Sequence, residues 1–383
     1  MNYQKTVVIS IPVLLVGGTE IQTLHLTGVL ISKGYKVIVL CYYEFDITIV
    51  NSFIECGAIV ELMKLNRSKG LLYLIVKLFK KLKKYKPDII HVQYIAPGLA
   101  PIIAAKISRI KTIFATVHQP GRVYGEKAKR FIKIASSLCT AFFCVSKSAE
   151  LSWFGNSDLF NAKNPNKNRK HFTIYNTVDE KKIIEVTQKT DKLEIKKSLK
   201  IENKKVIGVV GRLREEKSHS LLLSAFKELL KHQNDIFLVI IGDGPDKKIL
   251  EEQSKALGID KYVLWTGVKN QNEVFELYSI IDILAIPSRF EGFGLVAIEA
   301  MSAGIPVVAS NIDGLNEIIT HNDNGYLFAQ GDQEKLTTQL NKLLNSEKEQ
   351  QRVGENGRES VKEKFSFESF KNNIYSAYQF FSN

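Results

Sequence analysis

Short apolar runs alternate with amphipathic stretches along nearly the whole chain. In the first half, the runs "TVVISIP", "KVIVLCYY", "DIIHVQY", "KTIFATVH" and "AFFCVS" are rich in β-branched residues and are bounded by polar or turn residues. Between them lie stretches with helical periodicity, such as "TLHLTGVLISKG" and "LLYLIVKLFKKLKKY". Strands that alternate with helices in this way predict parallel sheets joined by crossover helices.

The same alternation resumes in the second half with "VIGVVG", "IFLVIIG", "YVLWTG", "ILAIPS" and "PVVAS". We expect the helices between these strands to begin near Ser218, Pro245, Asn272, Gly294 and Asn316. The stretch 149–171 interrupts the pattern, because it is rich in Asn and Lys, and it predicts a long surface loop.

The interruption places a domain boundary near residue 180. We therefore predict an α/β protein with two Rossmann-like, doubly wound domains, residues 1–180 and 181–365, facing each other across a cleft that holds the ligand. The aromatic residues of "SFESFKNNIYSAYQFF" predict a last helix, residues 366–383, that packs back on the first domain.

Composition supports an ordinary globular protein and excludes a fibrous or disordered one. The chain has 383 residues, of which 45% are hydrophobic and 24% charged, enough for two domains with sizeable cores. The four cysteines form no CxxC pair and lie mostly in apolar runs, which indicates free thiols in a reducing, cytoplasmic compartment. The apolar segment near residue 10 resembles a signal peptide, but it is far shorter than the ~20 residues that span a bilayer. We expect it to be the first strand of a βαβ unit.

Charge is distributed unequally between the two halves of the chain. Residues 1–200 hold 32 Lys and Arg against 14 Asp and Glu, a net charge of +18, whereas residues 201–383 carry −5. This asymmetry predicts an anionic partner for the first half. In "LLYLIVKLFKKLKKYKPD" the residues Leu72, Ile75, Val76 and Phe79 predict a buried stripe, with the lysines projecting outward. We expect these lysines to bind an anionic membrane surface at its inner, cytoplasmic face. Nucleic acid is disfavoured, because no nucleic-acid-binding motif accompanies the charge.

The segment "RFEGFGLVAIEA" contains two glutamates next to a glycine-bearing turn, which makes it a candidate ligand-binding site. It predicts a strand, a glycine-bearing turn and a helix whose N-terminus presents free N–H groups, an arrangement suited to phosphate. Glu291 lies in the turn, and Glu299 lies in the helix among apolar residues. Each glutamate alone is compatible with a solvated or ion-paired surface residue. A carboxylate in an apolar helix needs partners, however, and sugar hydroxyls can donate hydrogen bonds to it.

Two cations follow another predicted strand in "VIGVVGRLREEKS". Arg212 and Lys217 lie near its carboxyl end, before a helix that we expect Ser218 to cap. Ligands of open α/β sheets bind at that edge, so the two cations could neutralise a diphosphate. Exposed surface cations are the alternative. The GxG of "IIGDGPDKK" lacks the third glycine of a dinucleotide-binding motif.

Together, "GRLREEKS", "IIGDGPDKKILEE", the segment from "WTGVKNQNEV" to "PVVASNIDGLNEII" and the N-terminal "GGTEIQTLHLTGVLISKGYKVIVL" resemble the retaining glycosyltransferases of family 4. The resemblance covers nearly the whole chain, and the Glu-x7-Glu motif is its most specific part. It implies the GT-B fold, a hexosyltransferase activity, and a nucleoside diphosphate sugar as co-substrate, with no other cofactor.

The resemblance also implies a role for individual residues. Glu299 would bind the ribose hydroxyls and Glu291 the hydroxyls of the donor sugar, while Arg212 and Lys217 would bind the diphosphate. His118 would lie near the donor sugar, although a histidine after a strand is more often structural; His91 keeps the structural interpretation. The remaining donor-binding residues implied are Gly17, Gly18, Val268 (at the nucleobase), Phe293, Gly294, Leu295 and Val296.

The expected reaction moves a sugar from a UDP- or GDP-sugar to a glycan or lipid-linked acceptor with retention of configuration. No Asp-x-Asp and no His or Cys cluster is present in the sequence, so we predict that no metal is required and that Arg212, Lys217 and backbone amides replace it. The resemblance suggests bacterial surface polysaccharide synthesis. The alternatives are a catalytically silent subunit that supports a partner transferase, and a nucleotide-sugar epimerase of the same fold.

Overall fold

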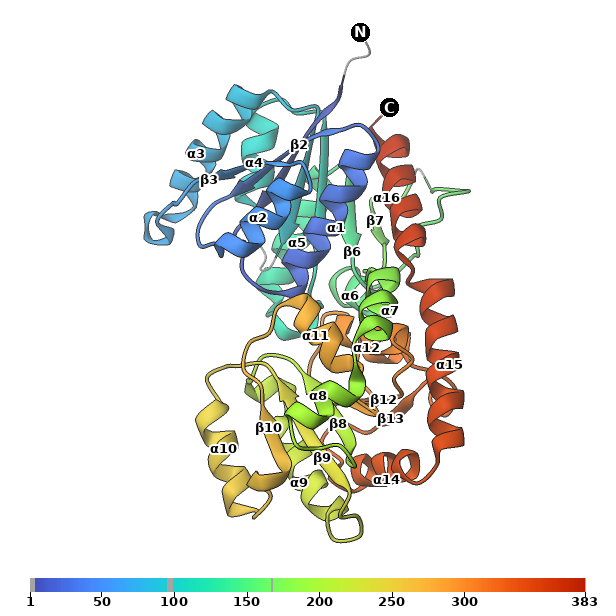
Figure 1. Cartoon of the computed structure of the whole chain (residues 1–383). Helices are drawn as coiled ribbons and strands as arrows, with labels where there is room; N and C mark the ends of the chain where they lie inside the picture. Colours follow the sequence, from blue (N-terminus) through green and yellow to red (C-terminus); the bar gives the residue numbers. More distant parts are fainter. Residues whose placement is uncertain (1–3, 95–98, 167, 383) are drawn as a thin grey trace. The chain divides into compact units, whose positions relative to one another are not determined.

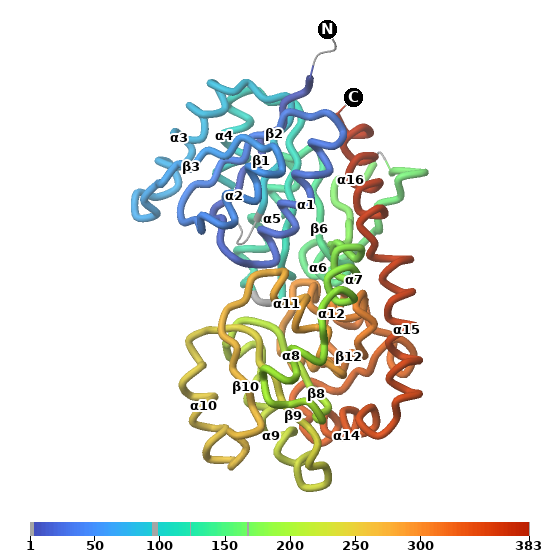
Figure 2. The backbone as a smooth tube through the Cα atoms, in the orientation of Figure 1, coloured from blue at the N-terminus to red at the C-terminus, as the bar shows by residue number. Residues whose placement is uncertain are grey.

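A computed structural model describes residues 4–94, 99–166 and 168–382 of the chain. The chain divides into two compact units, each with its own parallel sheet and core (Figures 1 and 2). Unit 1 comprises Met1–Asn176 and Glu368–Asn383, and unit 2 comprises Thr177–Phe367. Within the described residues, no helix combines the length and the apolar character needed to cross a bilayer.

Unit 1 is built on a seven-stranded parallel sheet in the order β3-β2-β1-β4-β5-β6-β7. Its strands are β1 (Thr6–Ile11), β2 (Lys36–Cys41), β3 (Ile59–Leu62), β4 (Ile89–Tyr94), β5 (Thr112–Val117), β6 (Ala141–Cys144) and β7 (His171–Thr173). Val7 pairs with Val37 on one side and with Ile89 on the other. The strand order reverses at β1, and ligands of doubly wound sheets bind beside the carboxyl ends of the strands at such a point.

Helices cover both faces of this sheet. They are α1 (Gly18–Ser32), α2 (Ile47–Glu55), α3 (Gly70–Tyr85), α4 (Ala100–Ile107), α5 (Glu126–Leu138), α6 (Lys147–Phe154) and α16 (Phe367–Phe381), with short 3₁₀ turns η1 (Arg67–Lys69) and η2 (Gly121–Val123). The helices α3 to α6 share one core with residues such as Ile90 and Val92 of β4. The intervening residue His91 points to the opposite face, where it contacts Tyr378 of α16.

The buried side of α3 differs from the prediction. Leu72 and Val76 are 80% and 51% exposed, and the buried residues are Leu74, Leu78 and Leu82. Both sets repeat every four residues, and the helix is apolar on more than one side, so spacing alone could not select the packed one. The expected stripe is therefore wrong for Leu72 and Val76, whereas Ile75 packs against the core and Phe79 is half-buried.

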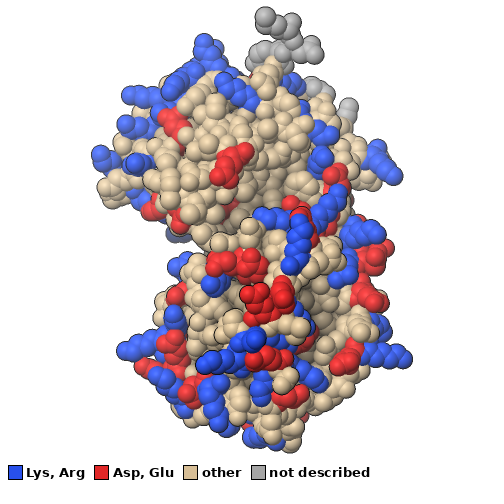
Figure 3. Space-filling view, in the orientation of Figure 1, with Lys and Arg blue, Asp and Glu red and all other residues tan. Residues whose placement is uncertain are grey.

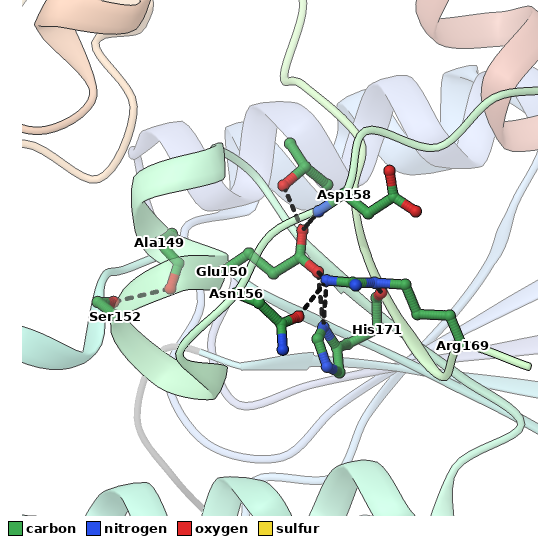
Figure 4. A network of polar contacts seen from close by, with 8 residues as sticks. Ala149, Glu150, Ser152, Asn156, Asp158, Arg169 and His171 are labelled. Atoms are coloured by element: carbon green, nitrogen blue, oxygen red, sulfur yellow. Dashed lines mark hydrogen bonds and ion pairs between the residues drawn. The ribbon is translucent and has the colours of Figure 1, made fainter. Parts of the chain in front are cut away.

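The prediction of a long surface loop at 149–171 is only partly correct, because the segment begins inside α6 and ends in β7, while the described residues between them form a mostly exposed loop. Ser146 caps α6, which extends to Phe154 and buries Trp153. Glu150 of α6 is fully buried, and its side chain holds the chain segment that follows the helix in place (Figure 4). Its carboxylate accepts hydrogen bonds at 2.6 to 3.0 Å from Arg169, His171, Thr173 and the amide of Asp158. These bonds hold the pKa of Glu150 below its ordinary value although burial alone would raise it.

Unit 2 has a six-stranded parallel sheet in the order β10-β9-β8-β11-β12-β13. Its strands are β8 (Lys205–Val210), β9 (Ile236–Ile241), β10 (Val263–Trp265), β11 (Ile283–Ile286), β12 (Val307–Ser310) and β13 (Tyr326–Phe328). Its helices are α7 (Glu180–Lys189), α8 (Lys192–Ser198), α9 (His219–Leu229), α10 (Lys247–Ala256), α11 (Gln271–Tyr278), α12 (Leu295–Ser302), α13 (Leu315–Ile318), α14 (Gln333–Leu344) and α15 (Glu347–Lys364), with 3₁₀ turns η3 (Glu215–Lys217) and η4 (Asp260–Tyr262).

The five strands predicted in this unit are confirmed as β8 to β12, whereas β13 was not predicted, and the predicted helix starts are met within about two residues. Gly304 follows α12 with φ of +77°, as expected for the residue after a helix C-cap. Ser218, however, does not cap α9 through its side chain. It adopts left-handed backbone angles, φ 52° and ψ 39°, because η3 ends directly before it and the chain must turn sharply into the helix.

Candidate functional site

The point where the strand order reverses in unit 2 is β8, which lies between β9 and β11. The loops that follow β8 and β11 therefore meet at the carboxyl edge of the sheet. They are joined by a backbone bond from the amide of Arg289 to the carbonyl of Glu216, 2.7 Å long, and by an ion pair between Arg289 and Glu215 at 2.7 Å. Two segments more than seventy residues apart in sequence thus form one structural element.

Lys217 and Glu291 face each other within this element. The Lys217 Nζ lies 2.6 Å from Glu291 Oε1, and Ser288 Oγ donates to the same oxygen at 2.8 Å. Both side chains are mostly buried, with 25% and 14% of their surface exposed, so this ion pair is held more firmly than one on an open surface. The structure brings the predicted cation and the first predicted carboxylate together.

Glycines allow each of these two loops to pack closely against a neighbouring segment of unit 2. Gly294 precedes α12 with φ of +112°, and an added Cβ would lie 2.7 Å from Leu315 Cδ2. Gly242 follows β9 with φ of +140°, and an added Cβ there would meet the carbonyl oxygen of Gly211 at 2.0 Å. Any side chain at these positions would displace the backbone that frames the site.

The N-terminus of α12 supplies donors beside this pair of side chains. The first amides of an α-helix have no partner inside the helix, and they lie at its positive end. Phe293 is buried and packs edge-on against Phe365, with ring centroids 5.7 Å apart, and this anchors the turn. Leu295 and Val296 are half-buried. The turn is therefore anchored by packing, and the amides at the start of the helix are chemically suited to an anion.

Glu299 lies one turn further along α12. It shares the more open side of the helix with Leu295 and Val296, while Ala297, Ile298 and Ala300 pack inward. The hydroxyl of Tyr278 donates to Glu299 Oε2 at 3.0 Å. Burial raises the pKa of Glu299 to about 7, and the hydrogen bond from Tyr278 partly offsets this rise. Tyr278 donates one hydrogen bond to this carboxylate, and a ligand hydroxyl could donate another.

Two predicted site residues of unit 2 lie in more open positions. Arg212 follows Gly211 after β8, is exposed, and makes no ion pair or hydrogen bond within the described part of the chain. Val268 lies in the loop after β10, with 67% of its surface exposed. Neither position is fixed by packing, and both side chains are accessible to a ligand.

In unit 1 the equivalent edge carries Gly17 and Gly18. Gly17 is the extended N-cap of α1 and Gly18 its first residue, so the loop after β1 presents helix amides at the point where the strand order reverses. An added Cβ at Gly17 would lie 2.7 Å from the carboxylate of Glu20. Glu20 itself is buried, and burial raises its pKa.

His118 comes directly after β5, at the same edge of the unit 1 sheet. Its Nε2 lies 2.7 Å from Gln93 Oε1 at the end of β4, and burial lowers its pKa to about 4, so the ring is neutral at pH 7. An amide oxygen can only accept a hydrogen bond, so Nε2 carries the proton and Nδ1 presents a lone pair. Within the described residues, His118 Nδ1 and Gln93 Nε2 are buried without partners.

A cavity of about 20 Å³, large enough for a water molecule, lies among these side chains and is also lined by Gln22 and Asn176. His91 lines it too, but its Nδ1 and Nε2 are both hydrogen-bonded, to Tyr378 and Thr116, at 2.7 Å each. The structural interpretation of His91 is therefore confirmed.

Sequence reasoning missed Ser288, Tyr278 and Gln93, each of which holds a predicted site residue in place. Ser288 precedes the Glu-x7-Glu motif, and its position at a strand end was the available signal. The sequence gives no indication that Tyr278 contacts Glu299 or that Gln93 contacts His118. Both contacts depend on packing between segments that are far apart in sequence. Among the described residues no group of three or more His, Cys, Asp or Glu is arranged as metal ligands.

Comparison with known proteins matches both halves of the chain to glycosyltransferase families. Residues 16–151 match the family described as Glycosyltransferase Family 4, and residues 190–360 match Glycosyl transferases group 1. A structure of Anabaena HepE in complex with UDP and glucose aligns over 98% of this chain and all of its own, with a TM-score of 0.81 and 18% identity. The chain therefore shares the two-domain Rossmann-like fold of this glycosyltransferase structure, and both of its halves are similar to glycosyltransferase families.

Among curated relatives, the N-acetyl-alpha-D-glucosaminyl L-malate synthase of Bacillus anthracis is 34% identical over 194 residues, half of this chain and 49% of the relative. The capsular polysaccharide biosynthesis glycosyltransferase CapM of Staphylococcus aureus is 28% identical over 50% of each chain. The chain thus spans about half the length of the curated relatives it matches.

Proposed function

We propose that the protein is a retaining, metal-independent glycosyltransferase that moves a sugar from a nucleoside diphosphate sugar to a glycan or lipid-linked acceptor. One observation carries the proposal. At the point where the strand order of unit 2 reverses, Lys217 and Glu291 are held 2.6 Å apart beside the N-terminus of α12, and Glu299 follows on the open side of that helix. A cation, helix amides and two carboxylates match a diphosphate followed by hydroxyl-rich groups.

Each part of the donor has a partner of suitable chemistry. Lys217, Arg212 and the amides of residues 293–296 would bind the diphosphate, and the charge that develops on the leaving nucleotide would be stabilised there. Glu299 would accept hydrogen bonds from the ribose, and Glu291 from the sugar. Val268 would lie against the nucleobase. The lysine ammonium has three donors, so Lys217 can keep Glu291 and still bind a phosphate oxygen.

Unit 1 would contribute Gly17, Gly18 and His118. The glycine amides at the start of α1 can approach a phosphate or sugar closely, because no side chain covers them. His118 is neutral, so it would act through hydrogen bonding at Nδ1 and not as a positive charge. In this mechanism no carboxylate serves as a nucleophile. The cleavage of the anomeric bond is promoted by stabilising the diphosphate that leaves.

The named relatives suggest which donor and acceptor to test first. HepE was solved with UDP and glucose, and the Staphylococcus aureus TarM structure contains UDP, which favours a UDP-sugar over GDP-mannose here. The name of CapM favours a role in surface polysaccharide synthesis. Such acceptors are carried on lipids, so we propose a peripheral location at the inner face of the membrane.

The test is a donor screen by saturation-transfer NMR or thermal shift with UDP- and GDP-sugars, followed by a hydrolysis assay. Binding of a nucleotide sugar with slow release of free sugar would support the proposal. Binding without any turnover, with or without acceptor, would favour a silent subunit. Conversion of the donor to its epimer would favour the epimerase alternative.

A further inference from the structure

Gln93 and His118 lie at the ends of two neighbouring strands of unit 1, on the same face of its sheet. Gln93 comes two residues after His91 in β4, and His118 comes two residues after Thr116 of β5. Side chains two residues apart along a strand share a face, and His91 bonds to both Thr116 and Tyr378, so this face is the one that α16 covers. Gln93 and His118 are only 3% and 8% exposed, and their contact is therefore part of the interior of unit 1.

The cavity of about 20 Å³ adjoins this contact. Leu26 of α1, with Phe370 and Ile374 of α16, lines its apolar side. On its polar side, Gln93 Nε2 and His118 Nδ1 are buried and have no partner within residues 4–94, 99–166 and 168–382. Gln93 Nε2 can only donate a hydrogen bond, and His118 Nδ1 can only accept one while Nε2 carries the proton. A buried donor and a buried acceptor thus border one cavity with room for a single water molecule.

We infer that this cavity binds one water molecule, which accepts a hydrogen bond from Gln93 Nε2 and donates one to His118 Nδ1. Gln93 then holds both nitrogens of the ring, Nε2 directly and Nδ1 through the water, and fixes the tautomer and the orientation of His118. It is a positioning residue for His118. The water satisfies two buried polar groups whose loss of hydration would otherwise be uncompensated.

Other occupants fit the cavity less well. A cation would meet the amide hydrogens of Gln93, and an anion would meet the lone pair of His118, so one of the two groups opposes either charge. A metal ion would also need further ligands, and the described part of the chain holds no group of three His, Cys, Asp or Glu. An apolar molecule would leave both polar atoms unpaired. A hydroxyl of the donor sugar has the same donor and acceptor character as water, and the first experiment separates these two sources.

The elements around His118 carry little charge. His91, on the same sheet face, is neutral as well, because burial lowers its pKa to about 3. The other titratable residues on the helices that line the cavity are Glu20 and His25 of α1, and Glu368, Lys371, Tyr375 and Tyr378 of α16. Glu368 and Lys371 pair with each other at 3.4 Å. The lysines and arginines of unit 1 gather instead along the edge where α3 lies, whereas the surface over α1 and α2 is mostly tan (Figure 3). Because Gln93 is uncharged too, the ring of His118 stays neutral.

The first experiment is a high-resolution crystal structure of the protein without and with UDP-glucose. We expect one ordered water within about 2.7–3.2 Å of both Gln93 Nε2 and His118 Nδ1 in each structure. A cavity without water in the donor-free protein would overturn the inference. So would an oxygen of UDP-glucose that replaces the water as the partner of both atoms.

The second experiment is NMR of the protein with nitrogen-15 in its histidine rings, for the wild type, Gln93→Met and Gln93→Glu. Wild-type His118 should show the Nε2–H tautomer alone, unchanged between about pH 5.5 and 8. Gln93→Met removes both hydrogen bonds, so the ring should populate both tautomers. Gln93→Glu keeps an acceptor for Nε2–H and should keep the tautomer, while its negative charge raises the pKa of His118 and makes the resonances titrate at higher pH.

Gln339→Met is the matched control, because Gln339 of α14 is only 5% exposed and lies in unit 2. It should leave the His118 resonances unchanged, and circular dichroism should show that each variant is folded. An Nδ1–H tautomer in the wild type, or the Nε2–H tautomer alone in folded Gln93→Met, would overturn the inference. If Gln93→Met does not fold, Gln93→Glu decides, and resonances that titrate as in the wild type would overturn it.

Only the effect on catalysis rests on the proposed function. Gln93→Met should lower kcat/KM roughly 10- to 100-fold, because the ring is no longer held in place, and Gln93→Glu should lose less. The water and the tautomer are measured without turnover. A protein that transfers no sugar could therefore still show both, and a missing water would leave a measured transfer standing.

Discussion

Replacing Glu299 with glutamine should make the protein more stable and its donor site weaker. The carboxyl of Glu299 has a pKa near 7 in the folded protein against an ordinary value of 4.5. A carboxyl with a raised pKa is disfavoured when ionised, so its contribution to stability is complete below pH 4.5 and is lost as the pH rises through 7. The difference corresponds to about 3 kcal/mol at pH 8, which the neutral glutamine would not lose.

The assay is urea unfolding of the wild type and Glu299→Gln at pH 5 and pH 8. At pH 5 the two should differ by less than about 1 kcal/mol, because folded wild-type Glu299 is then protonated and the glutamine oxygen can still accept the bond from Tyr278. At pH 8 the variant should be more stable by up to about 3 kcal/mol. The control is Glu276→Gln, which changes an exposed carboxylate in the same unit and should show no such pH dependence.

Donor binding should change in the opposite direction. An ionised carboxylate accepts stronger hydrogen bonds than an amide, so UDP should bind the variant about tenfold more weakly or worse at pH 8. Wild-type affinity should also increase as the pH rises through 7. A stability difference that does not vary with pH, or a variant that is less stable at pH 8, would refute the reasoning that burial disfavours the ionised form of Glu299.

Other predictions concern the remaining site residues. Lys217→Ala should cost on the order of 2–4 kcal/mol of transition-state stabilisation while the fold stays intact. A near-normal kcat would show that Lys217 does not stabilise the leaving diphosphate. Activity should persist in excess EDTA, and abolition followed by recovery with Mn²⁺ would contradict metal independence. His118→Asn should lower kcat/KM without changing its pH profile between pH 5.5 and 8, because burial holds the pKa of His118 at about 4; loss of a wild-type inflection would indicate a titrating His118. Gly294→Ala should weaken UDP binding more than Gly258→Ala, because only the former places a Cβ against Leu315; the circular dichroism of each variant serves as the folding control.

Most strands were predictable from sequence because they are short β-branched runs followed by a turn residue, but β13, which has no β-branched residue, was not predicted. The buried side of α3 could not be predicted. Leu72 and Val76 have the same spacing as Leu74 and Leu78, and only packing against the sheet distinguishes the two sets. The proximity of Lys217 and Glu291 could be anticipated from strand ends that meet at one edge. The partners Ser288, Tyr278 and Gln93 could not, since side-chain contacts across a core leave no periodic signal.

The position of α16 affects how the protein is made. Tyr378 is fully buried in unit 1, bonds to His91 and packs on Phe114 with ring centroids 4.7 Å apart. Almost two hundred residues of unit 2 separate these partners in sequence. During synthesis the first 176 residues therefore emerge with this side of their core uncovered, and unit 1 is completed only after α16 has been synthesised. A nascent chain would need protection from aggregation through that interval, and a stop codon before α16 would leave unit 1 without part of its core.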